Sequence, residues 1–234
     1  MEENAERTVN IAIDGPAGAG KSTIARAIAR RKGYIYVDTG AMFRAMAIYL
    51  IRKGTDGDDE EAISRDCAGA DITISYRPAE GSHTPEQRVL LCGEDVTDGL
   101  RTEEVGNMVS KCSVVPAVRD KLKELQRELA RKENVVMDGR DIGTVILPDA
   151  QVKIYLTASV GVRAKRRYDE LTARGEEADL SVIAAQIQER DRRDMTRPVA
   201  PLTQAEDAIL VDTSDMTIEE VTERILSIIR NTVI

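Results

Sequence analysis

Short apolar runs alternate with helix-periodic patterns along most of the chain. Runs rich in β-branched residues predict strands, and apolar positions spaced three and four residues apart predict helices. The predicted strands cover residues 8–13, 34–37, 134–138, 152–157 and 209–212. The predicted helices cover residues 24–31, 41–52, 118–131 and 217–230. Strands that alternate with helices indicate an α/β fold with a parallel sheet and right-handed crossovers.

One segment departs from this alternation. Residues 71–76 and 88–92 have strand patterns with no helical pattern between them, and a Gly-Glu-Asp turn follows the second. Such a pair is typical of short antiparallel strands. We therefore expect a single domain over residues 1–234 that carries an antiparallel insertion at about 67–100.

Composition excludes several classes of function. The chain has 234 residues, of which 42% are hydrophobic, so it can form a core. Its net charge of -8 and scarcity of aromatic residues argue against a nucleic-acid-binding protein. The single histidine, His83, lies in a polar, turn-like stretch, which disfavours histidine-based catalysis. With no apolar run long enough for a membrane and three unpatterned cysteines (Cys67, Cys92, Cys112), we expect a cytoplasmic location and reduced thiols.

A glycine-rich motif follows the first predicted strand and precedes the first predicted helix. It matches G-x-x-x-x-G-K-[ST], in the strand–loop–helix context that this motif requires. Backbone N–H groups of such a loop surround phosphate oxygens, its lysine reaches the β and γ phosphates, and its hydroxyl ligates Mg²⁺. The motif and the residue after it are Gly15, Pro16, Ala17, Gly18, Ala19, Gly20, Lys21, Ser22 and Thr23. The sequence therefore predicts a nucleoside triphosphate site with Mg²⁺ at Ser22.

The loop alone does not distinguish a switch, a motor and a kinase. The guanine-reading N-K-x-D element of a GTPase switch is missing, because no Asn-Lys dipeptide occurs. Residues 162–197 instead carry nine basic side chains in two helical patterns, and Arg190, Asp194 and Arg197 share one face of the second. Arg163, Arg166 and Arg167 share one face of the first. On charge pattern alone, a pair of exposed, salt-bridged helices is the favoured interpretation. Because a P-loop occurs in the same chain, we interpret the segment at about 162–197 as a mobile arginine lid over the phosphates.

Two short polar motifs follow predicted strands. Arg140 and Asp141 come directly after the strand at 134–138, at the carboxyl end of the sheet where open α/β folds bind ligands. Arg140 could bind a phosphate and Asp141 could accept from an amine or hydroxyl, although a plain Asp-Gly turn with surface charges is the alternative. The Asp38-Thr39-Gly40 motif is weaker evidence, because it is equally typical of a simple helix cap.

Taken together, these motifs resemble those of the bacterial cytidylate kinases, a family of P-loop nucleoside monophosphate kinases. The resemblance covers nearly the whole chain. It rests on I-D-G-P-A-G-A-G-K-S-T, D-T-G-A-M-F-R, M-D-G-R-D-I-G-T-V and E-R-D-x-R-D-x-x-R. It implies a three-layer, nucleoside-monophosphate-kinase-like fold with a parallel core sheet, an antiparallel monophosphate-binding insertion at about 67–100 and a short helical lid at about 162–197.

The resemblance also implies a role for each site residue. ATP would lie on residues 15–23, and the catalytic side chains would be Lys21, Arg140, Arg163 and Arg190. The CMP site would comprise Thr39, Arg44, Ser110, Arg119, Arg140, Asp141, Arg190, Asp194 and Arg197. Family members often have Ser in place of Thr39 and Tyr in place of Phe43. Thr39 keeps the hydroxyl of that Ser, whereas Phe43 keeps the ring of that Tyr but lacks its hydroxyl.

The implied activity is phosphorylation of CMP and dCMP by ATP, with Mg²⁺ as cofactor. Two alternatives stay open, namely a kinase that uses UMP or AMP as acceptor and a P-loop switch that hydrolyses nucleotide slowly. We expect a monomer, with nucleotides as its only partners and neither a nucleic acid nor a membrane among them.

Overall fold

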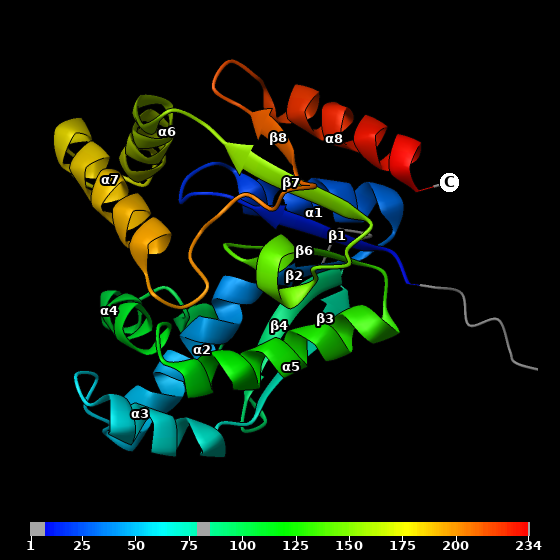
Figure 1. The fold of residues 1–234 in the computed structure, drawn as a ribbon. Helices are drawn as coiled ribbons and strands as arrows, with labels where there is room; N and C mark the ends of the chain where they lie inside the picture. The colour runs from blue at the N-terminus through cyan, green and yellow to red at the C-terminus, as the bar shows by residue number, and fades with distance from the viewer. Residues whose placement is uncertain (1–7, 79–84, 234) are drawn as a thin grey trace, which may run out of the picture. The chain divides into compact units, whose positions relative to one another are not determined.

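The computed structural model of the protein describes residues 8–78 and 85–233, so His83 lies outside the described residues. The chain divides into two compact units. The first combines the residues up to 34 with those from 134 onward, and the second comprises residues 35–133. Figure 1 shows the elements of both units. In the described part of the chain, no helix has both the length and the apolar character needed to cross a bilayer.

Parallel strands form the centre of the first unit. These strands are β1 (Asn10–Asp14), β6 (Val135–Gly139), β7 (Val152–Thr157) and β8 (Ile209–Asp212). They lie in the order β6-β1-β7-β8, and every adjacent pair is parallel. The first four residues of β6 are all buried, as expected for a strand covered on both faces. The predicted α/β fold with a parallel sheet is therefore confirmed.

Helices accompany these strands in the first unit. They are α1 (Lys21–Lys32), α6 (Val160–Ala173), α7 (Leu180–Thr196) and α8 (Ile218–Thr232). Helix α8 begins with a capping box between Thr217 and Glu220, which explains why the sequence places its start correctly. Helices α6 and α7 lie side by side and bury Ala164, Ile183 and Ile187 between them (Figure 1). A π-helical turn over Ile142–Ile146 follows β6, and the sequence analysis did not predict it.

The second unit contains β2 (Ile35–Asp38) and an antiparallel sheet of β3 (Ile72–Pro78), β4 (Pro85–Leu91) and β5 (Glu94–Asp95), in that order. The predicted antiparallel strands are thus present. The helices are α2 (Thr39–Lys53), α3 (Glu60–Asp66), α4 (Glu103–Cys112) and α5 (Pro116–Lys132). Helices α3 and α4 were not predicted from the sequence, although the capping side chains of Asp59 and Thr102 mark their starts.

Candidate active site

The glycine-rich loop connects β1 to α1 at the carboxyl end of the sheet. Gly15 has φ +147, and a Cβ atom there would lie 1.9 Å from the carbonyl oxygen of Leu156 in β7, so only glycine fits. Gly20 adopts a left-handed conformation and caps the first turn of α1. The free N–H groups of that turn therefore face the loop, which is the arrangement that binds phosphate.

Lys21 is buried at the base of this loop, with 6% of its surface exposed. Its Nζ donates a hydrogen bond of 2.8 Å to the carbonyl oxygen of Pro16. Burial, reinforced by the nearby positive charge of Arg140, lowers the pKa of Lys21 to about 7. A bound polyphosphate would supply the negative charge that favours the ammonium form, so the loop is suited to an anionic ligand.

Ser22 and Asp138 bring together a hydroxyl and a carboxylate beside the loop. The Ser22 Oγ lies 3.4 Å from Oδ2 of Asp138, a buried residue near the end of β6. One hydroxyl and one carboxylate, completed by phosphate oxygens and water, are a donor set that suits Mg²⁺. Sequence analysis named Ser22 alone as a metal residue and missed Asp138. The apolar strand pattern at 134–138, which ends in aspartate, was the available signal.

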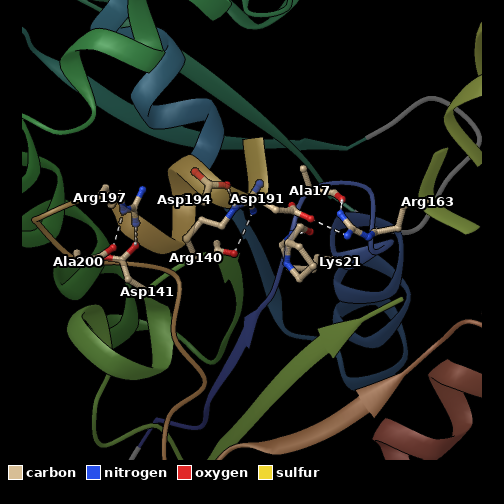
Figure 2. Close-up of polar contacts among 11 residues, drawn as sticks. Ala17, Lys21, Arg140, Asp141, Arg163, Asp191, Asp194, Arg197 and Ala200 are labelled. Atoms are coloured by element: carbon tan, nitrogen blue, oxygen red, sulfur yellow. Dashed lines mark hydrogen bonds and ion pairs between the residues drawn. The ribbon is translucent and has the colours of Figure 1, made fainter. Parts of the chain in front are cut away.

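Two ion pairs link the residues after β6 to helix α7 and to the residue that follows it (Figure 2). Arg140 Nε donates to Oδ2 of Asp194 at 2.8 Å, and an Nη of Arg197 lies 3.4 Å from Oδ1 of Asp141. Burial of Asp194 opposes its ionisation, but the positive charges of Arg140, Arg190 and Arg197 outweigh it and lower the pKa of Asp194. The structure therefore brings these predicted site residues together.

Arg197 differs from its predicted position on a helical face. Helix α7 ends at Thr196, and Arg197 is extended with ψ 141. The physical reason is Pro198, whose ring disfavours a helical conformation of the residue before it. The Arg197 side chain nevertheless reaches the site, because one Nη lies 3.4 Å from Asp141. Its Nε also donates to the carbonyl oxygen of Ala200 at 2.6 Å.

Arg163 is not a solvent-exposed lid side chain, because only 4% of its surface is exposed. Its guanidinium donates to the carbonyl oxygen of Ala158 at 2.9 Å. It also donates to the carbonyl oxygen of Ala17 at 2.9 Å and to Oδ2 of Asp191 at 2.6 Å (Figure 2). Since Ala17 belongs to the P-loop, Arg163 connects that loop to α7. Asp191 is a second residue that the sequence analysis missed.

The other arginines of the charged segment have different surroundings. Arg190 is exposed on α7, and its charge contributes to the lowered pKa of Lys21. Arg166 donates to the carbonyl and hydroxyl oxygens of Thr213. Arg167 forms an exposed pair with Glu170 three residues later, as the salt-bridge alternative predicts. Arg163, Arg166 and Arg167 were predicted to share one helical face, but their side chains have three different sets of partners.

The remaining predicted site residues belong to the second unit. Thr39 is buried in the first turn of α2, and Arg44 follows on that helix with its guanidinium 4.0 Å from Asp38. Arg119 on α5 donates to the carbonyl oxygen of Ser113 at 3.0 Å and lies over the ring of Phe43, 5.5 Å from its centroid. Ser110 on α4 is exposed, and its hydroxyl donates to the carbonyl oxygen of Gly106.

Fold and loop together define the class of the protein. A parallel sheet whose first strand leads into a glycine-rich loop, followed by a helix that begins at a buried lysine, is the architecture of P-loop nucleotide-binding proteins. A crystal structure of an uncharacterized protein from Eubacterium ventriosum has a similar fold. Its TM-score is 0.53 at 14% identity, and the match covers 96% of this chain and 99% of that one.

Sequence comparison defines the family. The cytidylate kinase family model matches residues 11–231. Cytidylate kinase of Bacillus licheniformis is 46% identical over 224 residues, which are 96% of this chain and 97% of that protein. Cytidylate kinase of Pelotomaculum thermopropionicum is 50% identical over 218 residues, 93% of this chain and 94% of that protein. The chain belongs to the cytidylate kinase family.

Proposed function

We propose that the protein transfers the γ-phosphoryl group of ATP to the phosphate of CMP or dCMP and releases ADP with CDP or dCDP. The observation that carries this proposal is membership of the cytidylate kinase family over almost the full chain, with an intact P-loop. An acceptor phosphate oxygen attacks the γ phosphorus, and the bond from that phosphorus to the β–γ bridging oxygen breaks. Such transfers depend on positioning and charge stabilisation and require no covalent enzyme intermediate.

Cationic residues would stabilise the transferred group. Lys21 lies at the base of the P-loop, where its ammonium can contact the β and γ phosphates. Arg140 and Arg190 carry positive charge close enough to Lys21 to affect its pKa, which supports their roles as phosphate ligands. Arg163 is assigned to the phosphates of ATP at the P-loop, because its guanidinium donates to the carbonyl oxygen of Ala17 in that loop. A Mg²⁺ ion held by Ser22 and Asp138 would neutralise negative charge on the β and γ phosphate oxygens.

Acceptor selection is assigned to Asp141, Arg119 and Ser110. A carboxylate accepts from the amino group of cytosine, and an arginine donates to its ring nitrogen or carbonyl oxygen. Uracil places a carbonyl oxygen where cytosine has its amino group, so Asp141 would face an acceptor at a cost of a few kcal/mol. Arg44, Asp194 and Arg197 are assigned to the phosphate and sugar of CMP. Thr39 is assigned to its sugar or base. The cytoplasmic location and the monomeric state stay predictions from the sequence.

An ADP-release assay tests the activity. The protein is supplied with ATP and Mg²⁺ and, separately, with CMP, dCMP, UMP, AMP or no acceptor. CMP and dCMP should stimulate ADP release far above UMP and AMP, and ADP release without an acceptor should be slight. A higher rate with UMP or AMP would refute the cytosine assignment, whereas hydrolysis that no acceptor stimulates would favour the P-loop switch.

A variant pair tests the base assignment in the same assay. Asp141→Asn keeps the size of the side chain but presents an amide, so it should reduce the preference for CMP over UMP. Asp149→Asn is the matched control, because Asp149 is exposed in the turn that precedes β7. An unchanged preference in Asp141→Asn would remove Asp141 from the base site.

A further inference from the structure

Asp14 is a buried carboxylate that the proposed mechanism does not use. It is the last residue of β1, and 5% of its surface is exposed. Its Oδ1 accepts a hydrogen bond of 2.8 Å from the backbone N–H of Ile142, and its Oδ2 accepts one of 2.7 Å from that of Gly143. Each oxygen thus holds one N–H group, and both groups belong to the first turn of the π-helical segment.

The position of Asp14 connects two parts of the site. It precedes Gly15, the first residue of the P-loop, and it pairs in register with Gly139 of β6. Arg140 and Asp141 occupy the two positions between Gly139 and the N–H groups that Asp14 holds. The chain segment that carries these two side chains is therefore held at one end by the β-sheet and at the other by the Asp14 carboxylate.

Backbone hydrogen bonds hold the later part of the turn, whereas the Asp14 side chain accepts from its first two N–H groups. The backbone oxygen of Asp141 accepts from the N–H groups of Val145 and Ile146, which closes the turn on itself. The first N–H groups of a helical turn have no partner within the turn and need an outside acceptor. π-Helical segments also occur frequently at functional sites. Loss of the Asp14 acceptor would release the start of the turn, and with it the two residues before it, Arg140 and Asp141.

The chemistry of Asp14 indicates that stability alone does not explain a carboxylate here. Burial raises the pKa of Asp14 to about 6, although both backbone hydrogen bonds favour the ionised form. A buried carboxylate that is disfavoured by its surroundings is more typical of functional sites than of ordinary cores. The two oxygens of Asp14 accept from two successive N–H groups. Among side chains of this size, only a carboxylate has two acceptor oxygens.

We propose that Asp14 is a positioning residue for the acceptor nucleotide. Its two hydrogen bonds hold the backbone directly after Arg140 and Asp141, and thereby set the discrimination between CMP and UMP. This inference rests on the proposed function, because it assigns the accuracy of base reading at Asp141 to a residue that does not contact the base. Asp14 acts through the turn, so its removal should affect which acceptor is used as well as how fast it reacts.

The Asp14→Asn variant tests this role. Asparagine keeps one acceptor oxygen but places an NH₂ group against the second backbone N–H, so one hydrogen bond is replaced by a donor–donor contact. The readout is the ratio of kcat/KM for CMP to that for UMP. We expect this ratio to fall by about tenfold, with a raised KM for CMP. A change in the charge of Lys21 alters phosphoryl transfer to either acceptor and cancels in the ratio.

A matched control separates positioning from loss of stability. Asp66 is also a buried aspartate, and its Oδ2 accepts a 2.8 Å hydrogen bond from Thr55 in the second unit. Asp66→Asn should lower the melting temperature and leave the CMP to UMP ratio at the wild-type value. A wild-type ratio in folded Asp14→Asn would overturn the inference. A wild-type enzyme without preference for CMP would instead overturn the proposed function.

A measurement on the unmodified protein covers the case in which Asp14→Asn does not fold. Amide hydrogen exchange of Ile142 and Gly143 is followed by NMR in the wild-type enzyme. If the Asp14 carboxylate holds both groups, their amide protons should exchange far more slowly than those of exposed turn residues. Exchange of both protons at the rate of an open loop would overturn the inference independently of any variant.

Discussion

Replacing Lys21 with methionine should stabilise the protein while it abolishes activity. Lys21 is buried, and burial together with the charge of Arg140 lowers its pKa from 10.5 to about 7. Each pKa unit is worth about 1.4 kcal/mol, so the buried ammonium reduces the free energy of unfolding at pH 7 by up to about 5 kcal/mol. Methionine fills a similar volume and carries no charge.

The net gain should be smaller than this upper value. The Lys21 ammonium donates to the carbonyl oxygen of Pro16, and losing this charged hydrogen bond costs about 1.5–3 kcal/mol. We therefore expect Lys21→Met to raise the free energy of unfolding at pH 7 by about 2–3 kcal/mol. ADP release with CMP should fall by orders of magnitude, because the β and γ phosphates lose their lysine.

The pH dependence provides the sharper test. Between pH 7 and pH 10.5 the unfolded wild-type chain holds the Lys21 proton while the folded protein has released it. The free energy of unfolding of the wild type should therefore rise with pH across this window. The advantage of Lys21→Met should be full below pH 7 and shrink as the pH rises toward 10.

Urea unfolding followed by circular dichroism at pH 7 and pH 9.5 measures the difference between the two proteins. Lys132→Met is the control, because Lys132 is largely exposed and pairs with Glu128 on the surface of α5. This control should change the free energy of unfolding by about 1 kcal/mol or less. A Lys21→Met protein that is no more stable than the wild type at pH 7, or whose advantage does not change with pH, would refute the reasoning.

Two further predictions concern other buried groups. Asp191→Ala leaves the buried guanidinium of Arg163 without its carboxylate, so the free energy of unfolding should fall by about 3–5 kcal/mol. Urea unfolding measures it, and a loss below about 1 kcal/mol would contradict a buried ion pair. Burial raises the pKa of the Cys112 thiol to about 12, whereas Cys92 is exposed. A thiol reagent at pH 8 should modify Cys92 rapidly and Cys112 only on unfolding; equal rates would show that Cys112 is accessible.

The sequence determined the features that depend on neighbouring residues. The strands at 152–157 and 209–212 have the predicted bounds, because apolar β-branched runs between polar turns specify strands locally. The P-loop was recognisable because its glycines, lysine and hydroxyl occupy fixed positions within one short stretch of sequence. The start of α8 was equally clear, since Thr217 and Glu220 cap it within three residues.

Shorter elements were harder to predict from sequence. Helices α3 and α4 span 7 and 10 residues, so their periodic patterns cover only two to three turns. The π-helical turn after β6 has no local signal of its own, because Asp14, from a strand more than a hundred positions earlier, supplies its acceptors. A backbone conformation that depends on a distant partner cannot be derived from the residues that adopt it.

The partners of the charged residues depend on the tertiary structure. Helical spacing placed Arg163 and Arg167 in one cluster, but the folded chain buries the first against Ala17 and leaves the second on the surface with Glu170. Asp138 and Asp191 gained their roles in the same way, through contacts across the fold. Local sequence determines the backbone conformation that a few neighbouring residues prefer. Burial and ion pairing depend instead on which distant segments of the chain come together in the fold.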